Sequence, residues 1–238
     1  CLNQKLSNNV RIIVVYSKLK NEKTLKRKFK NKKILFLNYL KKKNIPMHDQ
    51  LFKIEYANKL AKNEWVLLLD GDDMFTKNKI EFLNKLKLDS KKTYLNNHQI
   101  INGKFLNKVP KRKKYKKLYF YKKLFNSWPE KINTSSIIIH SNLLKKFYKK
   151  SKPYNWKYLA VDIQLALISH YKKSLIFIDK ILTLKRENIN NIDKTYSNHL
   201  KRIYWLRRYE QHNLTKKISN LSNPVDRLIT LIFMKILK

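Results

Sequence analysis

Three carboxylates stand within four residues, at Asp70, Asp72 and Asp73, and Gly71 separates the first two. They directly follow the apolar run Trp65–Leu69, although the whole chain has only 16 acidic residues against 55 Lys and Arg. Like charges this close repel one another unless a cation joins them. Carboxylate oxygens beside a diphosphate suit Mg²⁺ or Mn²⁺, and glycine lets a ligand approach the backbone. The alternative is a solvated loop in which an Asp caps the next helix.

The elements that must position these carboxylates predict an α/β fold. Apolar and β-branched runs indicate strands over residues 10–17, 32–40 and 65–69, and apolar residues spaced three and four apart indicate a helix over 47–62. This order is typical of an α/β sheet. Because residues 65–69 are apolar throughout, we expect a strand buried on both faces, as parallel strands are. The carboxylates then lie at its C-terminal end, where α/β sheets bind ligands.

The rest of the chain predicts further strands and then helices. The expected elements are a hairpin over 92–106 that turns at Gly103, a strand over 134–141, a helix over 159–173, a strand over 174–186, and helices near 195–213 and 224–238. We therefore expect an α/β domain over residues 1–190 and a helical C-terminal extension over 191–238. No apolar run approaches the length of a transmembrane helix.

The formal net charge of +39 first suggests a nucleic-acid partner. Only eight of the basic residues are Arg, whose fork geometry suits phosphates and base edges. Lys, Asn and Ile are abundant while Gly, Ala and Pro are scarce, as A/T-rich coding would produce. We therefore expect a solvated basic surface and no specific nucleic-acid site, with attraction to anionic lipid or phosphorylated substrates. Because Gly71 and Gly103 are the only glycines in the sequence, it contains neither a GxGxxG loop nor a Walker loop.

Two other acidic motifs fit the segment less well. An EF-hand loop that starts at Asp70 fails at its fifth and sixth positions, where Met74 and Phe75 stand in place of an oxygen ligand and Gly. Haloacid-dehalogenase-like phosphatases also place Asp-x-Asp after an apolar strand. They have Thr or Val at the position of Met74, and no later acidic pair completes such a site here.

The stretch "AKNEWVLLLDGDDMF" resembles the segment through the DxD motif of family 2 glycosyltransferases, nucleotide-sugar enzymes of the GT-A fold. Further stretches resemble the family in the same order, and together they cover about residues 1–186: "CLNQKLSNNVRIIVV", "TSSIIIHSNLL", "LAVDIQLAL" and "IFIDKILTLKR". The resemblance implies a GT-A mixed sheet flanked by helices. It also implies an enzyme that transfers a sugar, with inversion, from a nucleotide-diphosphate donor to a hydroxyl acceptor. The acceptor would be a glycan, a lipid-linked molecule or a surface polysaccharide.

The resemblance also implies the roles of the acidic segment. Asp70, Gly71 and Asp72 would bind the nucleotide donor. Asp72, with Asp73, would hold a divalent metal, Mn²⁺ or Mg²⁺, that bridges the diphosphate.

Downstream, the resemblance implies that Asp162 is the catalytic base, which accepts the acceptor's proton. The alternative role of Asp162 is a helix N-cap. Tyr154 and Trp156 are candidates for stacking on an acceptor sugar, and the alternative is that both are core residues.

Other functions remain open at this point. The chain could be a non-catalytic Lys-rich protein that binds nucleic acid or anionic membrane, or a haloacid-dehalogenase-like phosphatase. For the enzyme we expect a cytoplasmic location, with peripheral contact at the inner face of the cell membrane. The final "DRLITLIFMKILK" is too short to span a bilayer, but it could lie on a membrane interface or pack on a partner.

The resemblance finally concerns the beginning of the chain. Residues 10–15 match the family's second strand, and the family's first strand lies between that strand and the DxD strand. We therefore expect a fragment that lacks a central strand, binds nucleotide sugar poorly and aggregates. Roughly 30 upstream residues, a strand with its helix, would restore a donor-binding domain.

Overall fold

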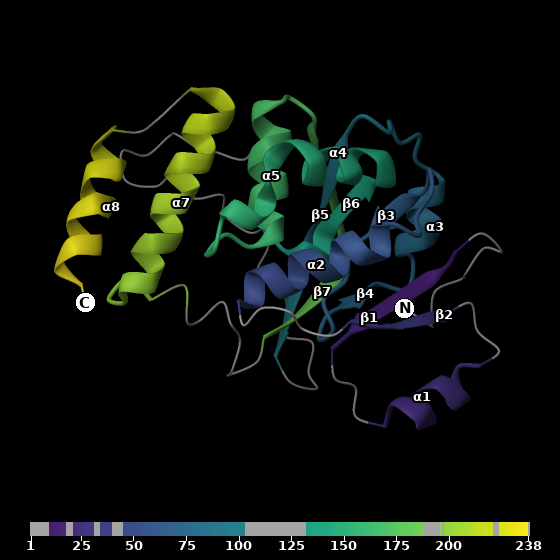
Figure 1. Cartoon of the computed structure of the whole chain (residues 1–238). Coiled ribbons are helices and arrows are strands. Elements are labelled where there is room, and N and C mark those ends of the chain that lie inside the picture. The colour runs from purple at the N-terminus through teal and green to yellow at the C-terminus, as the bar shows by residue number, and fades with distance from the viewer. Residues whose placement is uncertain are drawn as a thin grey trace.

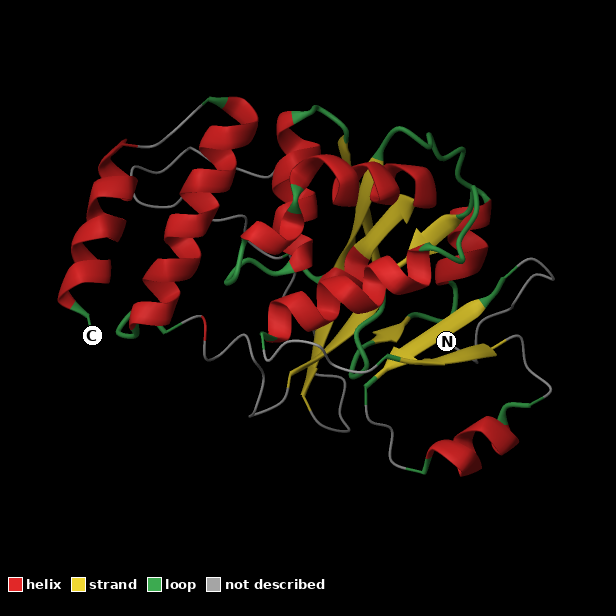
Figure 2. Cartoon of the chain, in the orientation of Figure 1, coloured by secondary structure: helices red, strands yellow, loops and turns green. Residues whose placement is uncertain are grey.

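The computed structural model describes residues 10–17, 21–30, 34–39, 45–102, 132–187, 196, 198–220 and 224–237. Helices flank two β-sheets, and a pair of helices, α7 and α8, lies at one end of the molecule (Figure 1). Figure 2 shows the same arrangement by element type, with strands in the middle of the α/β part. The predicted fold class, a mixed α/β sheet flanked by helices with a helical C-terminal part, is confirmed.

The N-terminal strands form a sheet of their own. β1 (Ile12–Tyr16) and β2 (Ile34–Asn38) are parallel, with Ile12 opposite Ile34. The sequence predicts both strands from their apolar runs. It does not predict α1 (Glu22–Lys28) between them, because that helix is short and basic and buries no residue.

The main sheet has five strands in the order β3 (Trp65–Leu67), β6 (Ile137–His140), β5 (Thr93–Asn102), β7 (Leu175–Glu187) and β4 (Met74–Phe75). β5 and β7 are parallel, and every other neighbouring pair is antiparallel. The expectation that the strand over 65–69 is parallel is therefore wrong for its described partner, β6. The expected burial on both faces is wrong as well, because all three residues of β3 are only partly buried. The apolar run predicts the strand, but not its burial or the direction of its neighbour. The hairpin turn expected at Gly103 lies outside the described residues.

The helices of the α/β part are α2 (Pro46–Asn58), α3 (Lys79–Asn84), α4 (Ser141–Ser151) and α5 (Val161–Tyr171). Leu165 and Ala166 of α5 share a core with Ile137 and Ile139 of β6. The strand predicted over 134–141 begins only at residue 137. Residues Thr134–Ser136 instead form a 3-10 turn, η1, before it.

The C-terminal helices are α7 (Arg202–Ser219) and α8 (Pro224–Ile236). α7 begins later than the sequence predicts. Leu214 of α7 packs in one cluster with Leu159, Ile163 and Leu167, so α7 shares a core with the α/β part. The division of the chain after residue 190 stays a prediction. Among the described helices, none has the length and apolar character that crossing a bilayer requires.

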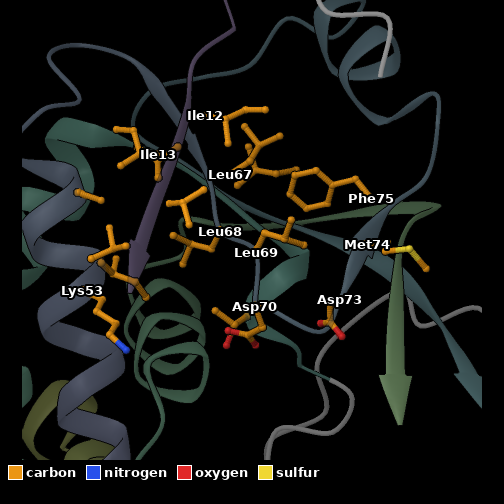
Figure 3. Close-up of a pocket in the computed structure, with 18 of the residues that line it drawn as sticks. Ile12, Ile13, Lys53, Leu67, Leu68, Leu69, Asp70, Asp73, Met74 and Phe75 are labelled. Atoms are coloured by element: carbon orange, nitrogen blue, oxygen red, sulfur yellow. The ribbon is translucent and has the colours of Figure 1, made fainter. Parts of the chain in front are cut away.

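An open cavity of about 2540 Å³ lies between the two sheets. Ile12 and Ile13 of β1 face Leu67 and Leu69 across it, and the acidic segment lies at one end (Figure 3). Within the described residues, β1 pairs with β2 and β3 pairs with β6, and the two sheets do not join. The expectation of a missing central strand stays a prediction.

The cavity predicts unequal costs for truncating two isoleucines. Ile137→Ala, at a fully buried position of β6 that does not line the cavity, should lower the free energy of unfolding by about 2–5 kcal/mol, because it opens a new hole. Ile13→Ala, at the existing cavity, should cost only about 1 kcal/mol, since its side chain loses little contact. Urea unfolding of both variants measures the difference. Equal losses would show that the space beside β1 is filled in solution.

Candidate functional site

The acidic segment forms a tight turn directly after β3. The Asp73 amide donates to the Asp70 carbonyl at 3.2 Å, and the Asp70 amide donates to Ser135 Oγ at 2.9 Å. The turn is therefore fastened to η1, which precedes the neighbouring strand β6. The apolar run positions the carboxylates at the strand end, as the sequence predicts.

Asp73 is buried, and both of its oxygens accept hydrogen bonds from the protein. Oδ2 accepts from Ser135 Oγ at 2.7 Å and from Asn133 Nδ2 at 3.1 Å, and Oδ1 accepts from the Arg186 amide at 3.0 Å. A buried carboxylate is stable only with such partners. This geometry gives Asp73 a scaffold role that joins the ends of β3 and β7 through η1.

Asp70 is half-buried at the cavity wall, where Gln50 Nε2 donates to its Oδ1 at 2.9 Å. The pKa of Asp70 is raised to about 7, mainly by burial and then by the negative charges of Asp162 and Asp73, while the Gln50 hydrogen bond acts in the opposite direction. Asp162 is therefore close enough to repel Asp70. The fold brings these two predicted site residues to one place, where their negative charges repel each other.

Asp162 lies in the first turn of α5 and lines the same cavity as Asp70, Gly71 and Asp72. Its Oδ1 accepts from the Ile163 amide at 2.7 Å. The N-cap of α5 is Ala160, so the alternative role of Asp162 as the N-cap is wrong. A carboxylate in the first turn is stabilised by the helix dipole.

Basic residues also line the cavity. Lys53, Lys77, Lys185 and Arg186 all line it, and Lys53 also pairs with Asp49 at 2.8 Å. Cations around a carboxylate floor suit a ligand that is itself anionic and carries a metal ion.

The two predicted acceptor residues lie elsewhere. The Tyr154 ring stacks on Phe52 with centroids 4.3 Å apart, and its hydroxyl donates to Glu55. Burial and this carboxylate raise the Tyr154 pKa. Trp156 packs against Leu159 and its cluster. Neither residue is among the described residues that line the cavity, so the geometry favours the core alternative for both.

Glu210 of α7 is a site-supporting residue that sequence reasoning missed. Its carboxylate accepts three consecutive backbone N–H groups, from Lys157 at 2.9 Å, Tyr158 at 2.7 Å and Leu159 at 3.2 Å. Burial raises the Glu210 pKa. These bonds hold the segment that leads into α5, and thereby fix the start of the helix that carries Asp162. No sequence signal marks the contact, because its partners are backbone groups.

Lys79 is a second missed residue. It is fully buried, and its ammonium donates to the Ser135 carbonyl at 3.0 Å and to Thr183 Oγ1 at 3.1 Å. It also lies 3.8 Å from the centroid of the Phe75 ring. Burial lowers the Lys79 pKa to about 7. The sequence gives no sign that Lys79 is buried, because the chain is so rich in Lys. The polar residues 133–136, which precede an apolar strand, are a sequence sign of a structured turn.

The burial of Lys79 predicts a pH-dependent stability. Between about pH 7 and pH 10.5, the unfolded chain holds a proton on Lys79 that the folded chain has released. The free energy of unfolding should therefore rise with pH in this window, by roughly 2–5 kcal/mol relative to Lys79→Met. Denaturant unfolding at pH 6 and pH 10 measures the difference between the two proteins.

Lys91→Met, at an exposed lysine, is the matched control and should show no such trend against wild type. A parallel pH dependence of wild type and Lys79→Met would show that Lys79 is not buried in solution.

Comparisons with known proteins identify the type of fold. No protein-family model matches the chain, and its sequence matches no curated protein. Solved structures do match. S. aureus TarS 1-349 is 13% identical with a TM-score of 0.56, and the same protein in complex with UDP is 14% identical with a TM-score of 0.54.

Each of these comparisons covers 98% of this chain and 62% of the neighbour, so the chain spans less than two thirds of the structures that it resembles. A longer S. aureus TarS structure is 16% identical with a TM-score of 0.54, over 92% of this chain and 40% of that one. TarS is a glycosyltransferase. The chain therefore has a glycosyltransferase fold of the GT-A type.

Proposed function

We propose that the protein is a family 2-like glycosyltransferase that moves a sugar from a nucleoside-diphosphate donor to a hydroxyl acceptor. The observation that carries the proposal is the meeting of Asp70, Asp72 and Asp162 on one cavity of a GT-A-type fold. The complex of TarS with UDP supports a nucleoside diphosphate as the donor's leaving group. The acceptor would be a hydroxyl of a glycan, a lipid-linked molecule or a surface polysaccharide.

The carboxylates fit a divalent cation, Mn²⁺ or Mg²⁺. Among the described residues there is no group of three or more His, Cys, Asp or Glu that could hold a metal. Asp70 and Asp72 would therefore hold the ion together with donor phosphates and water, which is how Mg²⁺ is commonly bound in nucleotide sites. When bound, the ion would neutralise charge on the departing diphosphate. Asp73, whose oxygens are occupied by hydrogen bonds, would keep the turn in place.

Asp162 would act as the general base. Its carboxylate would take the proton of the acceptor hydroxyl while the acceptor oxygen forms a bond to the anomeric carbon of the sugar. The bond from that carbon to the diphosphate breaks, and its electron pair leaves with the diphosphate, so the configuration at the carbon inverts. Lys53, Lys185 and Arg186, which line the cavity, would bind the negative charge of the phosphates.

Asp72→Asn should abolish metal-dependent binding of a nucleoside diphosphate and leave the fold standing. Removing one of several like charges is neutral or mildly stabilising without metal. Titration calorimetry with UDP, with and without Mn²⁺, measures the affinity. Asp179→Asn, at an exposed carboxylate outside the cavity lining, should bind as wild type does. If Asp72→Asn keeps the affinity of wild type in Mn²⁺, Asp72 is not a metal ligand.

Asp162→Asn should lower turnover by about two to four orders of magnitude, which is the usual worth of a general base. The Asn side chain keeps an oxygen that accepts the hydrogen bond from the Ile163 backbone N–H. Donor binding and stability should therefore hardly change. The measurement is the rate of sugar transfer at saturating donor, with donor affinity as the internal control. Near-normal turnover would reassign Asp162 to a structural role in the first turn of α5.

A further inference from the structure

Helix α8 carries an exposed apolar stripe. Its members are 40–67% exposed and follow one another at helical spacings of three and four, which places them on one face of the helix: Val225, Leu228, Ile232 and Ile236. α8 lies at the outer edge of the molecule, with α7 between it and the α/β part (Figure 1). An apolar face of this kind on a solvent-exposed surface marks an interaction site.

The opposite face of α8 is fastened to α7 by buried charges. Asp226 is 1% exposed and accepts from Arg208 Nε at 3.0 Å, and His212 Nε2 lies 2.9 Å from its other oxygen. Phe233 stacks on Trp205 with ring centroids 4.4 Å apart. The stripe therefore cannot turn inward without breaking a buried ion pair, which is strongly unfavourable.

The charges around the stripe indicate what covers it. Asp226 is the acidic residue of α8, and its burial beside Arg208 removes it from the surface. The exposed charges near the stripe are basic, including Lys235 on α8 itself and Lys201 and Arg202 at the start of α7. A second copy of a chain with a net charge of +39 would be repelled. An anionic lipid surface would attract the basic rim and accept the apolar stripe.

We propose that α8 docks its Val225–Leu228–Ile232–Ile236 stripe into the interface of an anionic bilayer, with the helix axis parallel to the membrane. Arg208 and Glu210 then connect this surface to the catalytic cavity. Arg208 fixes α8 to α7, and Glu210 fixes α7 to the segment before α5. Docking would hold the cavity at a set height and tilt above the bilayer, where an acceptor carried on a lipid presents its hydroxyl.

Vesicle co-sedimentation tests the docking surface without any assay of sugar transfer, so it can fail or succeed independently of the proposed function. The variant is Leu228→Gln with Ile232→Gln. The matched control is Ile100→Gln with Ile176→Gln, two isoleucines that are 42% and 38% exposed on other elements. Equal melting temperatures would show that both double variants are folded. The vesicles are phosphatidylcholine alone, or phosphatidylcholine mixed with phosphatidylglycerol.

Wild type and control should bind the anionic vesicles and keep part of that binding at about 1 M salt, where the Debye length is about 3 Å and surface charges are screened. The stripe variant should bind about tenfold more weakly or worse in low salt, and not at all in high salt, because only charge attraction remains.

Two results would overturn the proposal. One is equal binding of stripe variant and control, or no binding by wild type. The other is a lipid-free dimer of wild type, in sedimentation velocity, that the stripe variant converts to monomer. That second result would assign the stripe to contact between copies of the chain.

Discussion

The buried carboxylate of Asp73 is the interaction on which the site depends. Its two oxygens accept hydrogen bonds from two distant segments of the chain. The donors are the Ser135 hydroxyl, the Asn133 side-chain amide and the Arg186 backbone N–H. Without them a buried negative charge would strongly favour unfolding. The Lys79 side chain, at the start of α3, donates to the Ser135 carbonyl beneath the same turn. Asp70, Asp72 and Asp73 all line the cavity. Because both Asp73 oxygens already accept hydrogen bonds, Asp70 and Asp72 are the carboxylates that we propose for ligand binding.

A second carboxylate, Glu210, also acts as a structural support of the cavity by accepting hydrogen bonds. By accepting three successive backbone N–H groups before α5, it determines where that helix begins, and hence where Asp162 stands opposite Asp70. α7 therefore helps to shape the cavity although it belongs to the helical C-terminal part of the chain. The buried pair of Arg208 and Asp226 extends the same rigid connection to α8 at the surface. A contact made on α8 can in this way orient a cavity on the other side of α7.

The sequence predicted much of this, because apolar periodicity directly reflects burial. Most long elements and the acidic segment lie where the runs place them, and the fold class is right. Short elements without an apolar face, such as α1, gave no signal. Both strand direction and burial were misjudged for residues 65–69, because β3 pairs antiparallel with β6 and its residues are only partly buried. Lys79 and Glu210 were missed because their partners are backbone carbonyls and amides, which no side-chain pattern encodes. The expectation that Asp73 helps Asp72 to hold the metal stays a prediction. The sequence alone could not show that Asp73 is buried and that both of its oxygens accept hydrogen bonds.

The central claim is that Asp70 and Asp72 hold a metal ion and a nucleoside diphosphate at the cavity end that Asp162 faces. The most direct test is anomalous scattering from a crystal grown or soaked with Mn²⁺ and UDP. The account predicts a manganese peak within coordination distance of the Asp72 carboxylate and of the diphosphate oxygens, on the side of the cavity that Asp162 lines. A nucleotide bound elsewhere, or a manganese peak remote from both Asp70 and Asp72, would contradict it.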